Sequence, residues 1–137
     1  MTYLLDTNIL IFLIEKSYKK ISMKQMELIT NQDNKFVLSE ASLFEIGIKI
    51  RGGKGDFSNL NIFTLEEDYI RLNISLLKSK PVYYTNIPKV QSVIKKDGKI
   101  HGDPFDLLII SQAMVENLPV LSSDEYFPYY KDIVTIK

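Results

Sequence analysis

The chain has 137 residues, of which 45% are hydrophobic and 25% charged, proportions that fit one folded domain over residues 1–137 and exclude extended disorder. The 17 basic and 17 acidic residues cancel, so the overall charge gives no indication of nucleic-acid binding. Cysteine is absent, which excludes disulfides, thiolate metal sites and a cysteine nucleophile.

Two further features of the sequence concern location and charge distribution. There is no basic leader ahead of an apolar core and cleavage site, and no apolar run of transmembrane length, so we expect a cytoplasmic protein with no membrane contact. Lysines cluster between residues 16 and 24 and again between residues 78 and 99. Solvated surface is the favoured interpretation of both clusters, and contact with phosphate is the alternative.

The start of the chain predicts strands that alternate with helices. Tyr3–Leu5 is a short apolar strand candidate that ends at Asp6, and Ile9–Ile14 predicts a helix capped by Asp6 or Thr7. Ser22–Thr30 predicts an amphipathic helix, and a polar turn leads from it to a strand over Phe36–Leu38.

The next predicted helix begins after Ser39 and runs to about Arg51. The serine is expected to cap this helix, and the glycine-rich run over residues 52–55 is expected to end it. Its inward-facing residues are expected to be Leu43, Phe44, Ile46, Gly47, Ile48 and Ile50.

The middle of the chain, from Leu60 to Leu77, carries a mixed helical pattern around the sequence TLEEDYIRL. Pro81 precedes a strand candidate over Val82–Thr85, and a short helix is expected to follow from Asn86 to Ile94. The polar sequence KKDGK then predicts a surface loop.

The sequence HGDPFDLLIISQA, residues 101–113, predicts a capped and largely buried helix. Pro104 suits the first helical position, which makes Asp103 the N-cap and places Asp106 in the first turn. The apolar run after Asp106 leaves little polar face. Capping alone would explain both acids, since together they would contribute roughly 1 to 2 kcal/mol, and that interpretation stays open here.

The end of the chain continues the alternation with a turn at residues 117–119, a short strand at 120–121, a loop at 122–125 and an edge strand at 133–136. Short strands that alternate with helices predict a three-layer α/β/α sandwich with a mostly parallel central sheet. In such sheets, ligand-binding groups gather outside the C-terminal ends of the strands.

Several acidic residues are expected to converge at that edge of the sheet. Asp6 and Asp124 follow apolar strands directly. Asp103 and Asp106 open the buried helix, and Glu45 lies on the helix after the second strand. Unpaired carboxylates in such a cluster raise one another's pKa, which implies a bound cation or shared protons. Mg²⁺ and Mn²⁺ prefer oxygen ligands and can activate water for displacement at phosphorus, so the cluster predicts phosphodiester hydrolysis.

Four segments carry a family resemblance: YLLDTNIL, SEASLFEIGIKIRGGKG, HGDPFDLLIISQA and LPVLSSDEYF. In order and spacing they resemble the PIN-domain ribonucleases, and in particular the VapC-like toxins of toxin–antitoxin pairs whose motif contains DPFD. The resemblance extends over nearly all of the 137 residues.

The resemblance implies an activity, partners and residue roles. The implied protein is a metal-dependent endoribonuclease that cleaves RNA, pairs with a small cognate antitoxin and forms a homodimer. The implied ligands of Mg²⁺ or Mn²⁺ are Asp6, Glu45, Asp106 and Asp124, with Asn8, Asp103 and Ser122 in supporting positions.

The sequence departs from the family pattern in two places. Leu107 stands where a basic residue is usual after the second acid of DPFD, which removes an ion pair or a phosphate contact. The segment Ile87–Ile100 is longer and more polar than the family pattern predicts. His101, the one histidine, has no positioned nucleophile beside it in the sequence, so a structural or supporting role is favoured over a general base.

Alternatives remain for the acids and for the function. Asp6 and Asp103 can serve as helix caps, Glu45 can pair with a lysine four residues later, and Asp124 can be a turn residue. A regulatory binding module with a vestigial site is the non-enzymatic alternative. An aspartyl-phosphate phosphatase is disfavoured because Asn8 stands where its second acid is expected.

Overall fold

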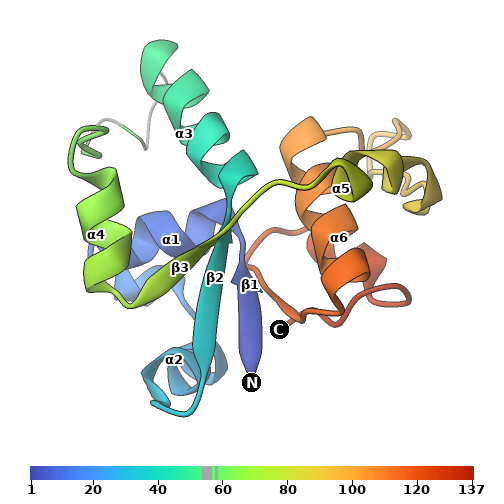
Figure 1. Ribbon diagram of the computed structural model, residues 1–137. Helices are drawn as coiled ribbons and strands as arrows, with labels where there is room; N and C mark the ends of the chain where they lie inside the picture. The colour runs from blue at the N-terminus through green and yellow to red at the C-terminus, as the bar shows by residue number, and fades with distance from the viewer. Residues whose placement is uncertain (54–56, 58) are drawn as a thin grey trace.

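The computed structural model describes residues 1–53, 57 and 59–137. Its centre is a parallel sheet with the strand order β3-β2-β1-β4. The strands are β1 (Thr2–Leu5), β2 (Lys35–Ser39), β3 (Ile74–Leu77) and β4 (Val120–Leu121). Figure 1 shows helices on both faces of the sheet, which confirms the predicted three-layer α/β/α architecture.

The helices of the described residues are α1 (Thr7–Ile14), α2 (Met23–Thr30), α3 (Glu40–Arg51), α4 (Leu65–Arg71), α5 (Pro81–Thr85) and α6 (Pro104–Glu116). Short 3₁₀ turns lie at Tyr18–Lys20, Ile87–Lys89 and Phe127–Tyr130. None of the helices in this part of the chain has the length and apolar character needed to cross a membrane.

Two hydrophobic clusters separate the layers, because side chains alternate between the two faces of a strand. Tyr3 and Leu5 of β1 pack into a cluster with α1 and α4. Leu4, between them, faces the other side and packs into a cluster with α6. In Figure 1, α1 and α4 accordingly lie on one side of the sheet and α5 and α6 on the other.

Helix α3 confirms its predicted cap and part of its predicted inward face. Ile46 is fully buried, and Leu43 and Ile50 pack against the core as expected. The hydroxyl of Ser39 accepts a hydrogen bond from the backbone N–H of Ala41 at 3.0 Å. Phe44 and Ile48 were expected to be buried, yet 64% and 47% of their surfaces are exposed. The buried residues of the helix are Ile46, as predicted, and also Ala41, Ser42 and Glu45. Burial of Ser42 is possible because it accepts a hydrogen bond from Thr7 at 2.9 Å. Of the glycine run 52–55, Lys54 and Gly55 lie outside the described residues.

Two segments have the opposite secondary structure from the one predicted. Ile74–Leu77, expected within a helical region, forms β3 and pairs in parallel with β2. Asn73 makes this possible, since its left-handed φ of 59° ends the preceding helix and turns the chain toward the sheet. The predicted strand Val82–Thr85 is instead part of α5. Pro81 starts that helix, and Tyr83 is its buried residue.

The two remaining differences concern weaker elements. The helix predicted over residues 86–94 is reduced to the 3₁₀ turn Ile87–Lys89, after which the chain is extended. The edge strand predicted over residues 133–136 is reduced to a single parallel bridge between Ile136 and Val120. Strand β4 is two residues long, so it offers little ladder for a further strand.

The topology reverses at β1, which lies between β2 and β4. From β1 the chain proceeds to β2 and β3 on one side, and then crosses through α5 and α6 to reach β4 on the other. The C-terminal ends of β1 and β4 are therefore the switch point at which parallel sheets bind ligands. Asp6 and Ser122 follow those two ends directly.

Substitution of Leu38 tests whether this side chain belongs to the hydrophobic core. Its side chain on β2 is fully buried, and it pairs with Leu5 and Leu76 on the flanking strands. We expect Leu38→Ala to lower the free energy of unfolding by about 2–5 kcal/mol, measured by urea denaturation. Phe63→Ala, at a residue that is 92% exposed, should change it by less than about 0.5 kcal/mol. Equal losses in the two variants would contradict this core.

Candidate metal centre

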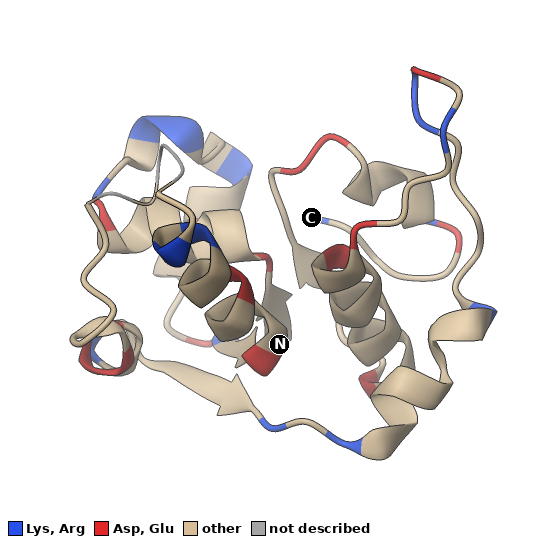
Figure 2. Cartoon of the chain, turned by 90° about the horizontal axis from the view of Figure 1, so that it is seen from above, with Lys and Arg blue, Asp and Glu red and all other residues tan. Residues whose placement is uncertain are grey.

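One cavity of about 80 Å³ gathers the acidic residues that the sequence singled out. It lies at the C-terminal ends of the strands. Figure 2 shows acidic positions on α3 and at the start of the neighbouring helix α6. Thr7, Asn8 and Lys49 contribute to its wall. The acids that line it are Asp6, Glu45, Asp103, Asp106 and Asp124. The structure thus brings the whole predicted set together.

Asp6 is held by a chain of hydrogen bonds from the end of β4. It stands at the N-cap position of α1, yet its side chain makes no capping hydrogen bond. Its Oδ2 instead accepts a hydrogen bond from the hydroxyl of Ser122 at 2.8 Å. The Ser122 oxygen in turn accepts from the backbone N–H of Asp124 at 3.0 Å. Asp6 and Asp124 are therefore positioned by one shared serine, and helix capping does not explain Asp6.

Glu45 enters the cavity from the buried face of α3. Its carboxylate is 2.8 Å from the ammonium of Lys49, one helical turn further on. Only 8% of the Glu45 side chain is exposed, and 40% of the Lys49 side chain is. The predicted i, i+4 pair therefore exists, and it lies within the cavity rather than on a separate surface.

Asp106 is oriented by the lone histidine. Nε2 of His101 lies 3.1 Å from Oδ2 of Asp106, and Nδ1 lies 2.7 Å from the hydroxyl of Tyr130. Asp103 is the N-cap of α6, since its Oδ1 accepts hydrogen bonds from the backbone N–H groups of Phe105 and Asp106 at 2.9 and 3.0 Å. His101 thus supports an acid, and Asp103 caps the helix that carries it.

The environment of the cluster perturbs two carboxyl groups strongly. Burial raises the pKa of Asp6 to about 7, the hydrogen bond from Ser122 opposes the rise, and neighbouring carboxylates add to it. Burial likewise raises the pKa of Asp106 to about 8, with further contributions from Asp103 and the other acids. Near neutral pH each group therefore holds a proton for part of the time unless a cation replaces it.

The donor set fits a hard divalent cation. The acids supply carboxylate oxygens, which Mg²⁺ and Mn²⁺ prefer, and the raised pKa values of Asp6 and Asp106 indicate negative charge that the protein leaves poorly compensated. Within the described ranges, however, no three acidic or histidine side chains stand ready to hold one ion without moving. Glu45 faces Lys49 and would have to turn toward a shared ion, whereas Asp106 has one carboxylate oxygen held by His101.

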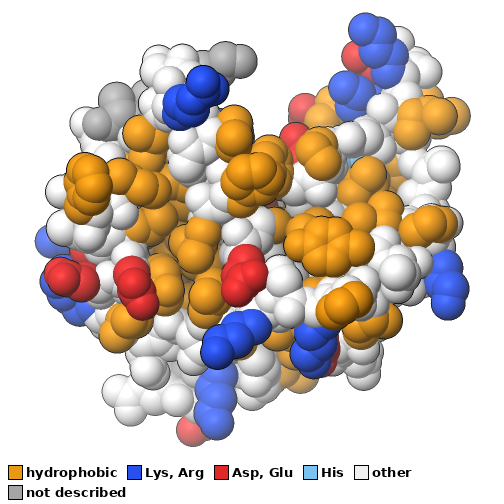
Figure 3. Space-filling view, turned by 45° about the horizontal axis from the view of Figure 1, so that its top comes forward, with side chains coloured by type: hydrophobic (Ala, Val, Ile, Leu, Met, Phe, Trp, Pro, Cys, Tyr) orange, Lys and Arg blue, Asp and Glu red, His pale blue; other side chains and the backbone are white. Residues whose placement is uncertain are grey.

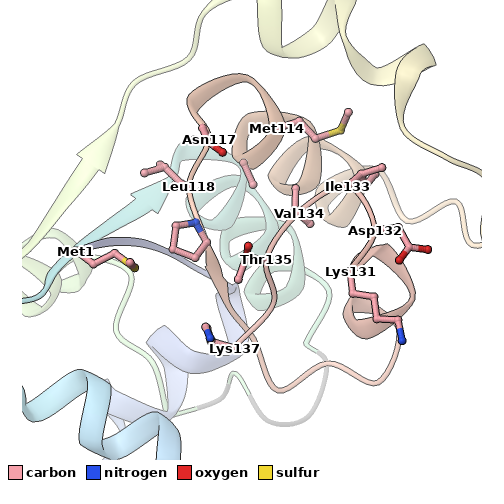
Figure 4. A pocket seen from close by; sticks show the side chains of 12 residues that line it. Met1, Met114, Asn117, Leu118, Lys131, Asp132, Ile133, Val134, Thr135 and Lys137 are labelled. Atoms are coloured by element: carbon pink, nitrogen blue, oxygen red, sulfur yellow. The ribbon is translucent and has the colours of Figure 1, made fainter.

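Other hollows in the protein differ in chemistry. A pocket of about 410 Å³ lies near the start of β1 and the loop before β4, as Figure 4 shows around Met1, Leu118 and Lys137. That is the opposite end of the strands from the acids, where parallel sheets do not gather ligand groups. An open hollow of about 520 Å³ adjoins the acids themselves and is lined by Asp106, Asp124 and the segment around His101.

Several residues near the acids were missed or underrated in the sequence. The Tyr130 hydroxyl contacts His101, and the Thr7 hydroxyl donates to Ser42 on the buried face of α3. Both contacts join residues that are far apart in the sequence, so the sequence does not reveal them. Lys49 lines the cavity, although its spacing from Glu45 predicted only a helix pair. Leu107 of α6 packs against the core and supplies no charge to the cavity. The basic side chain that lines the cavity is Lys49 of α3.

The comparisons with known proteins agree with this arrangement. The family model of the PIN domain matches residues 3–133. The chain belongs to the PIN domain family. No curated protein matches the sequence. The family assignment thus rests on a match that spans all of the acids, from Asp6 to Asp124.

The PIN domain described here also resembles solved structures over its full length. VapBC2 from Rickettsia felis, bound to a promoter DNA fragment, is 19% identical with a TM-score of 0.67, over 100% of this chain and 98% of that one. VapBC-1 from nontypeable Haemophilus influenzae is 22% identical with a TM-score of 0.64, over 100% and 97%. DNA-bound VapBC from Salmonella typhimurium is 17% identical with a TM-score of 0.67, also over 100% and 97%. At these identities the likeness concerns the fold.

The raised pKa values predict how stability depends on pH in metal-free protein. Asp6 and Asp106 bind protons more tightly in the folded state, so folding is favoured at low pH and this contribution is lost as pH rises through about 7 to 8. Thermal unfolding in chelator should therefore give a higher Tm at pH 6 than at pH 8.

Asp106→Asn should flatten this pH dependence and raise the Tm at pH 8, because the buried charge is gone. Asp33→Asn, at an exposed turn residue, is the matched control and should leave the profile unchanged. A wild-type Tm that rises between pH 6 and pH 8 would contradict the assigned shifts.

Proposed function

We propose that this PIN domain is a metal-dependent endoribonuclease that hydrolyses RNA phosphodiester bonds. The observation that carries the proposal is the convergence of Asp6, Glu45, Asp106 and Asp124 on one cavity. Burial of several carboxylates with one lysine among the cavity-lining residues costs stability, and a divalent cation compensates that cost.

The proposed chemistry assigns a part to each group of residues. Bound Mg²⁺ or Mn²⁺ would lower the pKa of a coordinated water and stabilise charge that develops on the phosphoryl oxygens. Asp6, Asp106 and Asp124 would supply ligand oxygens, and Glu45 would join them by turning from Lys49. Ser122 would keep Asp6 in place through its 2.8 Å hydrogen bond, and His101 would orient Asp106 from 3.1 Å.

Lys49 has a distinct proposed part. In the metal-free arrangement its ammonium neutralises Glu45 at 2.8 Å. If the Glu45 side chain rotates toward a bound metal ion, the Lys49 ammonium would be released at the cavity wall. There it could contact a substrate phosphate. This would replace the basic residue that is missing at Leu107.

The biological setting we propose is a toxin–antitoxin pair. The solved structures named above are VapBC assemblies, two of them on DNA, and the segments that carry the family resemblance run through the whole chain. The proposed partners are a small cognate antitoxin that blocks the acidic cavity and a second copy of the chain in a homodimer.

The acids argue against the alternative of a vestigial regulatory module. In a protein that binds no cation, replacement of Asp6 or Asp106 by a neutral residue would remove an unfavourable buried charge. Both acids remain, and so do the serine and the histidine that position them. Their presence is what a working metal centre requires.

RNA cleavage tests the activity directly. With Mg²⁺ or Mn²⁺, purified protein should cleave single-stranded or looped RNA. Cleavage is measured by gel electrophoresis of an end-labelled substrate. Asp6→Asn and Asp106→Asn should each lower kcat/KM by ~100-fold or more, because each loses a charged oxygen ligand. Asp33→Asn should cleave like the wild type. Equal cleavage by the Asp6→Asn protein would point to a contaminating nuclease and overturn the assignment.

Metal binding separates a working site from a vestigial one without any substrate. At a Mn²⁺ concentration about 100 times its Kd, the ion should stabilise the folded protein by about 2.7 kcal/mol, seen as a rise of several degrees in Tm. Asp6→Asn should lose most of this rise, whereas Glu27→Gln on the exposed face of α2 should keep it. No rise in the wild type at millimolar Mn²⁺ would support the vestigial module instead.

A further inference from the structure

The segment from Ile94 to Ile100 forms a tight basic hairpin beside the metal centre. The two isoleucines make an antiparallel bridge, and the backbone N–H of Lys95 donates to the carbonyl of Lys99 at 2.8 Å. Gly98 occupies the turn with a φ of +82°, a conformation that favours glycine. The hairpin therefore has a defined shape, although the sequence predicted only a surface loop.

The hairpin is joined to the acidic cluster through His101. The backbone N–H of His101, the next residue after the hairpin, donates to the carbonyl of the buried Val93 at 2.7 Å. The imidazole of the same residue lies 3.1 Å from Asp106. The position of the hairpin is thus tied to the position of an acid in the cavity.

A hollow of about 520 Å³ separates the hairpin from the acids. Lys95 and Ile100 of the hairpin line this hollow together with Asp106 and Asp124. The ring of Tyr126 also lines the hollow, stacked on His101 with a centroid separation of 5.2 Å. Figure 3 shows a notch at the top of the molecule between two raised edges, with basic side chains on both.

Two of the three lysines of the hairpin take part in weak ion pairs, and the hairpin itself keeps a net positive charge. Lys95, Lys96 and Lys99 outnumber Asp97, and the ammonium of Lys95 lies 3.8 Å from Asp97 and 6.0 Å from the Tyr126 ring centroid. Lys96 and Glu125 form an exposed pair at 3.6 Å, which contributes little. An RNA backbone that approaches the acids is repelled by them, so it needs positive charge close by.

We propose that the 94–100 hairpin and Tyr126 form the subsite that holds single-stranded RNA on one side of the cleaved phosphate. The lysines contact backbone phosphates, and a base stacks on the Tyr126 ring, as aromatic side chains do in single-strand binding. The inference deepens the proposed nuclease function and rests on it. It also gives a role to the segment by which this chain departs from the family pattern.

Binding measured without catalysis tests the subsite. A fluorescent single-stranded RNA is titrated with wild type and with the triple variant Lys95→Ala, Lys96→Ala, Lys99→Ala in chelator, from about 50 to 200 mM salt. The triple variant should raise Kd roughly 10-fold. The slope of log K against log salt should become shallower by about 0.7 for each lysine–phosphate interaction that the substitutions remove. Lys19→Ala, Lys20→Ala, Lys24→Ala is the control that removes the same charge, and it should match the wild-type slope.

Kinetics and two single-residue comparisons complete the test. In the cleavage assay the hairpin triple variant should raise KM roughly 10-fold with kcat within about twofold, since the acids are untouched. Tyr126→Ala should raise Kd by about 5-fold or more, and Tyr126→Phe should not, because stacking needs the ring alone. Lys95→Met keeps the aliphatic stem and guards against loss of folding in the triple variant.

The outcomes distinguish the inference from the function beneath it. If wild type cleaves RNA and the hairpin variants keep its KM, Kd and salt slope, the subsite is overturned and the nuclease stands. If wild type neither binds nor cleaves RNA with Mg²⁺ or Mn²⁺, the proposed function itself fails. If Tyr126→Phe weakens binding as much as Tyr126→Ala, the stacking role of the ring is wrong.

Discussion

The burial of Asp6 at the end of the central strand is the constraint on which the site depends. Its carboxylate takes part in no ion pair among the described residues and is held by the hydroxyl of Ser122 at 2.8 Å. A buried carboxylate with so little compensation carries a raised pKa and lowers the stability of the folded state when it ionises. The cation proposed above would compensate this charge, which lowers the stability of the metal-free fold.

The other acids reach Asp6 because the order of the strands reverses at β1, with β2 and β3 on one side and β4 on the other. Helix α3 brings Glu45 from one side of the switch point, and α6 brings Asp106 from the other. Each of these acids has a partner that orients it, Lys49 in one case and His101 in the other. In this arrangement Lys49 holds Glu45, and a rotation of the Glu45 side chain would be its route to the proposed cation.

Much of this fold was predictable because local signals agree with the tertiary structure. Strands β1, β2 and β4 are short apolar runs, and the caps at Ser39 and Asp103 form as predicted. The predictions for β3 and α5 were wrong because their identities depend on packing: a left-handed Asn73 frees β3 from the helix before it, and Pro81 starts a helix in a segment rich in strand-forming residues. Local patterns do not contain these tertiary effects.

The acids of the site were also predictable, since parallel sheets gather ligand groups at a switch point and the motifs mark each position. The supporting contacts were not. Tyr130 lies twenty-nine positions after His101 in the sequence and contacts it only in the folded chain. The 94–100 hairpin depends on a backbone bridge that its polar sequence does not predict. The supporting residues of the site are therefore identified by contacts between segments far apart in the sequence, which composition and spacing do not predict.

The hydrogen bond between Ser122 and Asp6 spans 116 positions of the chain. Strand β4, which delivers the serine, enters the sheet beside the first strand although it is the last of the four to be synthesised. Contacts of such long sequence separation cannot form until β4 has left the ribosome. A growing chain therefore lacks an assembled acidic cluster, so the ribosome that makes this protein is not exposed to the proposed activity before that strand has emerged.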